Sequence, residues 1–224
     1  MKIVALVGSP RKKKSNTAAL VDLVCAGAGE EDGESEVIFL PGGTVKPCRG
    51  CDVCHITGSC GQKDEFLSIR EKIMAADGLV LASPNYIDHV SAQLKAFIDR
   101  CCGIVHTLGF RSRYGAAVVT SGGGPEEPVA KYLERVLLIT GIIPVGSVFA
   151  TMGTARGSFS EEVRTAAQGL GRQLVRAWKE KKTFPHADRE MAAFRERMRW
   201  LMESRKNEWG YEYDYWRQHF GLAS

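Results

Sequence analysis

The chain has 224 residues, of which 44% are hydrophobic and 25% are charged, and its net charge at pH 7 is +4. This length and apolar content predict one α/β domain with a buried core and a small appendage. The weak positive charge does not indicate nucleic-acid binding. No apolar run approaches the roughly 20 residues of a membrane span, and the short apolar N-terminus lacks the features of a secretory signal. We therefore expect a cytoplasmic protein with neither a nucleic-acid nor a membrane partner.

Five short apolar runs predict the strands of a parallel sheet, at residues 3–7, 37–40, 79–82, 116–120 and 145–150. Most of them lack polar alternation, as strands buried on both faces do. Apolar residues at helical spacing predict the intervening helices, at residues 17–26, 65–76, 91–105, 127–140 and 161–181. This alternation predicts a doubly wound sheet whose ligand lies beyond the carboxyl ends of the strands.

The composition changes after Pro185. Residues 186–206 have the pattern of a charged helix, and an aromatic-rich segment follows. All four tryptophans lie late in the chain, at Trp178, Trp200, Trp209 and Trp216. We divide the chain into a sheet domain of residues 1–183 and an extension of residues 184–224. The extension is expected to pack on the domain or on a second subunit, or, alternatively, to line a neighbouring active site with its aromatic side chains.

The segment GSPRKKKSNT, at residues 8–17, follows the first strand and precedes a helix. Its glycine, hydroxyls and cations at a helix N-terminus predict an anion site. Lys13 stands where a Walker loop needs its second glycine, and the dinucleotide fingerprint G-x-G-x-x-G is absent. The loop therefore favours a single terminal phosphate, as on FMN. The alternative is that Ser15 only caps the helix.

Two further loops follow the third and fourth strands: SPNYIDHVSAQLKAFIDR at residues 83–100 and TSGGG at 120–124. Consecutive glycines allow the backbone to approach a flat ligand, so that their N–H groups can donate to the polar edge of an isoalloxazine. The alternative is a flexible turn. Tyr86 is a candidate to pack on the flavin ring, and His89 a candidate to stabilise negative charge on reduced FMN. For His89, a surface role is the competing interpretation.

The segment CRGCDVCHITGSC, at residues 48–60, has the spacing C-x2-C-x2-C-x5-C. A reducing compartment and an odd total of seven cysteines argue against disulfides. Zinc sites with four cysteines usually join two C-x2-C knuckles separated by a dozen or more residues. Three ligands at intervals of three resemble ferredoxin runs and favour a [4Fe–4S] cluster. Redox-active thiols and zinc stay open as alternatives. His55 is expected to be solvated, or alternatively to hydrogen-bond a sulfur of the loop. The remaining cysteines, Cys25, Cys101 and Cys102, are expected to be structural.

Together, GSPRKKKSNT, SPNYIDHVSAQLKAFIDR and TSGGG resemble the NADPH-dependent FMN reductase group of flavodoxin-like proteins. Within that group, the four-cysteine segment resembles the iron–sulfur flavoproteins. The resemblance implies a flavodoxin-like five-stranded sheet, FMN, and a cysteine-rich loop after strand two that holds a [4Fe–4S] cluster. It also implies a homodimer or homotetramer in which the cluster of one subunit faces the FMN of another.

The resemblance also implies which residues bind the cofactors. The cluster ligands would be Cys48, Cys51, Cys54 and Cys60. The phosphate contacts would be Ser9, Arg11, Ser15, Asn16 and Thr17, and the ring and ribityl contacts Pro84, Asn85, Tyr86, Ile87, Ser121, Gly122 and Gly123.

The sequence shows no acid/base pair, catalytic triad or metal-hydrolase motif, which fits chemistry carried by cofactors. The first functional hypothesis is transfer of single electrons from a ferredoxin-like donor through the cluster to FMN and on to a small-molecule acceptor. The second is an NAD(P)H-dependent FMN or quinone reductase in which the cysteines are peripheral. A third is a redox sensor or interaction protein.

Overall fold

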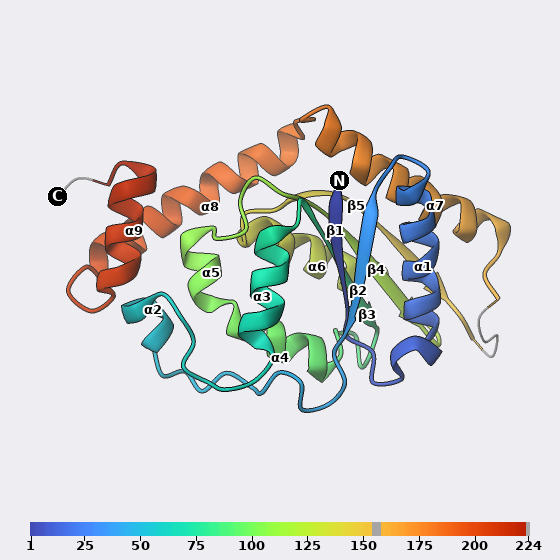
Figure 1. The fold of residues 1–224 in the computed structure, drawn as a ribbon, viewed down its shortest axis with the longest axis horizontal. Coiled ribbons are helices and arrows are strands. Elements are labelled where there is room, and N and C mark those ends of the chain that lie inside the picture. Colours follow the sequence, from blue (N-terminus) through green and yellow to red (C-terminus); the bar gives the residue numbers. More distant parts are fainter. Residues whose placement is uncertain (154–157, 223–224) are drawn as a thin grey trace.

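The computed structural model describes residues 1–153 and 158–222. Five parallel strands form one sheet in the order β2-β1-β3-β4-β5 (Figure 1). The strands are β1 (Lys2–Val7), β2 (Glu34–Phe39), β3 (Gly78–Pro84), β4 (Tyr114–Ser121) and β5 (Ile143–Thr151). Each overlaps an apolar run of the sequence. This is the flavodoxin-like order, and its topological switch point lies between β1 and β3. The predicted doubly wound sheet is confirmed.

The helices of the described residues follow the predicted alternation and add short elements to it. They are α1 (Asn16–Gly29), α2 (Val53–Thr57), α3 (Phe66–Ala75), α4 (Ala92–Arg100), α5 (Cys102–Thr107), α6 (Glu127–Ile139), α7 (Glu161–Lys179), α8 (Pro185–Ser204) and α9 (Gly210–Phe220), with a 3-10 turn at Lys12–Lys14. Serines cap three of them, because the side chains of Ser15, Ser91 and Ser160 each accept a hydrogen bond from a backbone N–H in the first turn.

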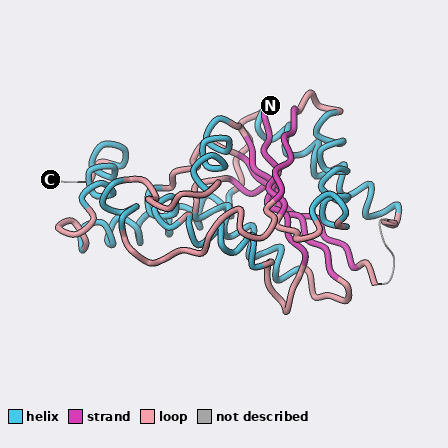
Figure 2. The backbone as a smooth tube through the Cα atoms, turned by 60° about the horizontal axis from the view of Figure 1, so that its bottom comes forward, coloured by secondary structure: helices cyan, strands magenta, loops and turns pink. Residues whose placement is uncertain are grey.

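The sheet lies between two layers of helices, and Figure 2 shows the strands with helices on both sides. Helices α1 and α7 cover one face, where Ala5 and Val7 pack with Leu174. Helices α3, α4 and α6 cover the other face, where Leu6 packs with Leu94. The two helices of the first layer cross closely at Gly27 and Gly171. A Cβ at either glycine would meet backbone of the opposite helix at 2.0 Å.

One predicted helix is two helices in the structure. The periodicity of residues 91–105 continues without interruption, but α4 ends at Arg100 and α5 begins at Cys102. At the break, the amide of Cys101 donates to Ile98 O at 3.0 Å, which is an i→i+3 bond that tightens the last turn. Cys101 faces the core and is 2% exposed, whereas Cys102 opens the next helix and is half-buried.

The extension after residue 184 packs on the sheet domain. Helix α8 contacts α6, and α9 contacts α2, α5 and α8. Trp216 is fully buried among Leu108, Phe194 and Met202, and its Nε1 donates to His106 O at 2.9 Å. Figure 1 shows α9 at the end of the molecule beside α2. Across residues 1–153 and 158–222, every helix is too short or too polar to span a membrane.

Candidate functional site

The loop between β1 and α1 brings hydroxyls and cations to the carboxyl end of the sheet. Ser15 accepts a hydrogen bond from Ala18 N at 3.0 Å and donates to Lys12 O at 2.7 Å, so its side chain does cap α1. Ser9 is 2% exposed, and its Oγ accepts a weak hydrogen bond from Arg11 N at 3.4 Å. Arg11 and the three lysines that follow are exposed around the same helix N-terminus. Loop and helix together present positive charge.

The loop after β3 contains a sharp turn and a buried polar atom with no partner. Tyr86 and His89 exchange backbone hydrogen bonds of 2.8 and 3.2 Å, and Ile87 between them has φ of +51° and is fully exposed. Asn85 Nδ2 donates to Pro125 O at 2.8 Å. Asn85 Oδ1 is buried and has no hydrogen-bond partner among the described residues. A donor group on a bound ligand, or a water molecule, would satisfy this acceptor.

His89 is exposed but packs on a neighbouring ring. Its imidazole lies edge-on to Tyr132, with 4.5 Å between ring centroids, and its Nδ1 accepts from Val90 N at 2.9 Å. Tyr86 is 46% exposed on the same turn. Both side chains therefore stand at the mouth of the loop, where a planar ligand can reach them.

The loop after β4 is fixed through one hydroxyl. Ser121 Oγ accepts from Gly123 N at 3.1 Å and Gly124 N at 2.6 Å, and it donates to Glu126 Oε1. Thr151 also donates to Glu126 Oε1, at 2.5 Å. A Cβ built on Gly122 or Gly123 would meet nothing within 4 Å. Their backbone therefore faces open space.

Hydrogen bonds hold these three loops together. Thr17 Oγ1 and Thr120 Oγ1 lie 2.7 Å apart, Asn85 N donates to Thr120 O at 2.7 Å, and Ser91 Oγ donates to Gly8 O. The loops meet at the switch point, where doubly wound sheets bind their ligands. We call this region the flavin edge: residues 8–17, 84–89 and 120–124. The open glycine backbone, the unsatisfied Asn85 oxygen and the cationic helix N-terminus fit a phosphorylated planar ligand such as FMN.

The cysteine segment follows β2, as expected, and its helix α2 packs against α5 and α9 (Figure 1). Cys48 and Cys51 are exposed, and Cys54 and Cys60 are half-buried. A Cβ added to Gly103 of α5 would lie 3.5 Å from Cys54 Cβ, so α2 packs against α5. Gly58 ends α2 with φ of +76°, and the ring of Tyr211 from α9 covers it at 2.4 Å from an added Cβ. We call this region the cysteine face: residues 48–60 with α5 and α9.

The cysteine loop has features that suit a metal cluster. Gly50 has φ of +61°, and its N–H donates to Cys48 Sγ at 3.4 Å. The guanidinium of Arg100 lies beside Cys60. A single zinc ion would hold its thiolates about 3.8 Å apart, but among the described residues no three of these sulfur atoms lie within 4.8 Å of one another. A four-iron cube holds its thiolates farther apart than one ion does, because the cluster stands between them.

The base of the loop is closed by a buried ion pair. Arg100 Nη1 lies 2.7 Å from Asp64 Oδ2, with side-chain exposures of 1% and 3%. Asp64 also accepts from Lys46 N at 2.9 Å, and Arg100 donates to Lys46 O at 3.1 Å. Above this pair is a cavity of about 160 Å³ whose walls include Cys54, Cys60, Arg70, Arg100, Tyr211 and Tyr215.

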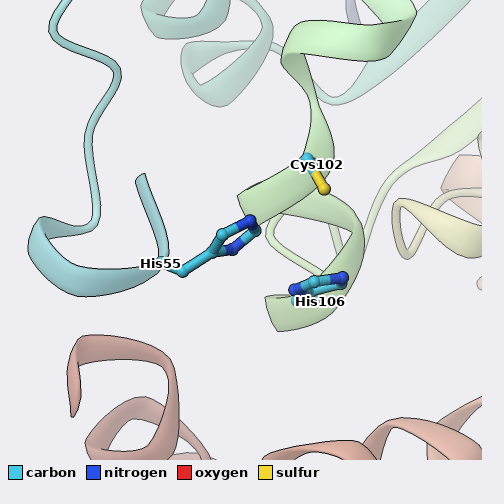
Figure 3. A group of neighbouring side chains, drawn as sticks. All are labelled: His55, Cys102 and His106. Carbon is cyan, nitrogen blue, oxygen red and sulfur yellow. The ribbon is translucent and has the colours of Figure 1, made fainter. Parts of the chain in front are cut away.

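Behind the cysteine loop is a group of polar residues that the sequence reasoning missed. Glu212 of α9 is completely buried, and it lies 2.6 Å from His55 Nδ1 and 2.8 Å from His106 Nδ1. The two imidazoles stack with 4.7 Å between centroids, and Trp209 stacks on both. Figure 3 shows His55 reaching from α2 toward Cys102 and His106 of α5.

This group alters the acid–base properties of its members. Hydrogen bonds from His106 and His55 lower the pKa of Cys102 to about 6, against the opposing effect of burial. Burial acts to lower the pKa of His106, but its hydrogen bonds with Cys102 and Glu212 outweigh burial and raise that pKa to about 9. Burial likewise opposes protonation of His55, and its bonds to Cys102, Cys54 and Glu212 raise its pKa.

Two expectations are therefore wrong. His55 is not solvated: it is 4% exposed, because the carboxylate that pairs with it comes from the extension 157 residues later. Cys102 is not an inert structural thiol, since it lies against two imidazoles. The one local signal was the i, i+4 spacing of Cys102 and His106, which places both on one side of a helix.

Comparisons with known proteins agree with this architecture. Residues 1–157 match the family model of the NADPH-dependent FMN reductases. An iron-sulfur flavoprotein of Archaeoglobus fulgidus is 29% identical over 219 residues, 97% of this chain and 98% of the relative. An iron-sulfur flavoprotein of Methanocaldococcus jannaschii is 36% identical over 148 residues, 65% of this chain and 76% of the relative. The structure of a flavodoxin from the domain Archaea superposes with a TM-score of 0.53 at 14% identity, covering 80% of this chain and 99% of the flavodoxin.

Proposed function

The chain belongs to the NADPH-dependent FMN reductase family and, within it, to the iron–sulfur flavoproteins, and from this premise we propose that it transfers single electrons from a ferredoxin-like donor to FMN through a [4Fe–4S] cluster. A small molecule is the final acceptor. The activity is that of a flavin-dependent oxidoreductase. The observation that carries the proposal is the four-cysteine segment, in a chain that aligns with an iron-sulfur flavoprotein over 97% of its length.

The flavin edge supplies the residues that would hold FMN. The cationic loop and the N-terminus of α1 would bind the phosphate through Ser9, Arg11, Ser15, Asn16 and Thr17. The loops after β3 and β4 would hold the ribityl chain and the ring through Pro84, Asn85, Tyr86, Ile87, Ser121, Gly122 and Gly123. The unsatisfied Asn85 oxygen supports this assignment, because it needs a donor. Tyr86 and His89 lie on the turn after β3 and would tune the charge and exposure of the ring.

The cysteine face supplies Cys48, Cys51, Cys54 and Cys60 as ligands of the cluster. Hydrogen bonds to sulfur and nearby cations stabilise the negative charge of such a centre. The N–H of Gly50 and the guanidinium of Arg100 provide both. Bound FMN exchanges electrons in pairs or singly and a [4Fe–4S] cluster exchanges them singly, so the two groups together connect one-electron carriers with two-electron acceptors.

The separation of the two regions supports an oligomer. Within one chain, the cysteine face packs with α5 and α9, whereas the flavin edge lies at the ends of β1, β3 and β4. We therefore propose a homodimer or homotetramer in which the cysteine face of one subunit lies against the flavin edge of another. Size-exclusion chromatography with light scattering tests this, and a monomer at assay concentration contradicts it.

The deciding measurement is the content of iron, acid-labile sulfide and FMN per chain in protein purified without air. We expect about four iron, four sulfide and one FMN. The Cys60→Ser variant should lose iron and keep FMN, while Cys25→Ser, a control on α1, should keep both. FMN without iron in the anaerobic wild type would reject the cluster.

The family description favours a second candidate, direct reduction of FMN by NADPH. In that case the cysteines are peripheral, and NADPH should bleach the flavin in the wild type and in Cys60→Ser at the same rate. Stopped-flow absorbance separates the two functions. If bleaching occurs only with a reduced ferredoxin and only when the cluster is intact, direct reduction by NADPH is excluded.

A further inference from the structure

Three side chains other than the four cysteines of the motif have the arrangement of a metal site. One ligand atom each of His55, Cys102 and His106 lies within 4.8 Å of the other two. They come from two elements, with His55 on α2 and the other two on successive turns of α5 (Figure 3). Tetrahedral zinc with bonds of about 2.0–2.3 Å holds such atoms about 3.3–3.8 Å apart. Closing the site around an ion therefore needs movements of only about 1–1.5 Å.

Glu212 orients both imidazoles in the way that metal sites require. The Nδ1–H groups of His55 and His106 donate to the two carboxylate oxygens of Glu212, at 2.6 and 2.8 Å. Each ring thereby keeps a proton on Nδ1, and binding of an ion would displace the proton on Nε2, which then donates its electron pair. A carboxylate behind a ligating histidine fixes the tautomer and raises the basicity of the ligand. Here one buried carboxylate does this for both histidines at once.

The site is closed and electrically balanced. Trp209 covers both imidazoles with centroid separations of 4.4 and 5.1 Å, and Glu212 is completely buried. With the ion bound, the two imidazoles would be neutral, and the Cys102 thiolate and the Glu212 carboxylate would contribute two negative charges. A divalent cation brings the sum to zero, which is the condition under which charges are tolerated in a protein interior.

We propose that His55, Cys102 and His106 bind one Zn²⁺ ion, with Glu212 as the carboxylate that orients the two histidines. Nitrogen and thiolate donors select zinc over the hard ions that prefer oxygen. The ion would join α2 to α5, and α9 would be held to both through Glu212. The site shares no ligand with the proposed cluster, although Cys54 and His55 are neighbours in sequence.

The first test is elemental analysis and zinc-edge X-ray absorption on tag-free protein purified without air, given one equivalent of Zn²⁺ and then desalted. We expect one zinc per chain with sulfur at about 2.3 Å and nitrogen at about 2.0–2.1 Å. An all-sulfur shell places the ion in the cysteine loop and overturns the proposal. Retention of no zinc overturns it too, and leaves a metal-free hydrogen-bond network.

Matched variants provide the second test. In competition with a chelating dye, Cys102→Ser and His106→Ala should bind zinc at least 100-fold more weakly. In Glu212→Gln the zinc affinity should fall about 10- to 100-fold, as it does when the group that orients a ligating histidine is changed. Cys25→Ser and His186→Ala change a cysteine and an exposed histidine elsewhere and should bind as the wild type does. Unchanged affinity in folded Cys102→Ser and His106→Ala contradicts the site.

Iron and sulfide are counted on the same samples, so the two metal proposals can fail separately. A chain without iron that retains zinc in a nitrogen–sulfur shell supports this site and removes the cluster. A chain with four iron and no zinc does the reverse. If a variant does not fold, as judged by far-ultraviolet circular dichroism, the zinc-edge X-ray absorption spectrum of the wild type is the test of the site.

Discussion

The flavin edge and the cysteine face are assembled in opposite ways. At the flavin edge, three loops follow three strands, and each is fixed largely by its own residues: Ser15 caps α1, and Ser121 holds the Gly123 and Gly124 amides. At the cysteine face, the critical contact is between His55 and a carboxylate 157 residues away. The flavin edge combines local caps with hydrogen bonds between adjacent strand ends, whereas the cysteine face also needs the extension to be packed against it.

This difference predicts different sensitivities. The strands that carry the flavin edge are the most buried part of the chain, because residues 3–7 and 116–119 all have exposures of 3% or less. The cysteine face rests on short helices and on buried charges, where removing one partner leaves the other without compensation. A substitution that disrupts the extension should therefore destabilise the cysteine face and leave the flavin edge of the same chain unchanged.

The largest effect is expected for Glu212→Ala. The substitution leaves two buried imidazoles without their carboxylate, and loss of one partner of a buried pair costs about 3–5 kcal/mol of unfolding free energy. Urea denaturation measures this loss. FMN content per folded chain should not change, because within one chain none of the flavin-edge hydrogen bonds among the described residues involves α9.

Glu208→Ala is the matched control for that variant. Glu208 is exposed and pairs with Arg205 on the surface of the same extension, so its loss should cost no more than about 1 kcal/mol. A Glu212→Ala protein as stable as this control would show that the buried carboxylate does not hold the cysteine face together. Parallel loss of FMN would break the distinction between the two regions.

A smaller effect, dependent on pH, is expected for Asp64→Asn at the base of the cysteine loop. Burial alone would raise the pKa of Asp64, but Arg100 and the amides of Lys46 and Phe66 outweigh burial and lower it. The folded pKa is thus below the unfolded value of about 3.9. The stabilisation is complete above about pH 5 and disappears as the pH falls through the folded pKa.

The wild type should therefore exceed Asp64→Asn by about 1–3 kcal/mol near pH 7, the range for hydrogen bonds to charged groups. The difference should shrink toward about pH 3. Urea denaturation at several pH values checks this. Asp99→Asn, which removes an exposed i, i+4 pair with Lys95, should cost at most about 0.5 kcal/mol. A constant difference across the pH range would contradict the role of the Asp64 charge.

The sequence predicted the sheet and the helices around it because those elements depend on local signals. Strands that are buried on both faces appear in the sequence as apolar runs, and a serine such as Ser15 before a helical pattern indicates an N-cap. The break between α4 and α5 left no such signal, since the apolar spacing runs through Cys101 and only an i→i+3 bond marks it. Helix α2, five residues inside the cysteine loop, was too short for periodicity to reveal.

The two parts of the candidate site differ in the same way in how far the sequence predicts them. The residues of the flavin edge follow strand ends, so topology alone brings their loops together, and their roles toward FMN stay a prediction. Glu212 lies within YEYDYW, where nothing in the neighbouring residues indicates burial or a partner. Its pairing with His55 depends on where α8 directs the chain, which is a property of tertiary packing and not of any short pattern.

At the flavin edge, the variant Gly123→Val tests FMN binding with the smallest expected loss of unfolding free energy. The added side chain enters open space, because a Cβ there meets nothing within 4 Å, and Gly123 has no positive φ that forbids a side chain. The unfolding free energy of the apoprotein should change by no more than about 0.5 kcal/mol. FMN affinity should fall about tenfold or more, equivalent to about 1.4 kcal/mol, since the branched side chain would occupy the proposed ring position. Fluorescence titration with FMN measures it, and zinc and iron contents should match the wild type. Unaltered FMN affinity would place the ring away from the β4 loop, and the open space at Gly123 would then need another ligand.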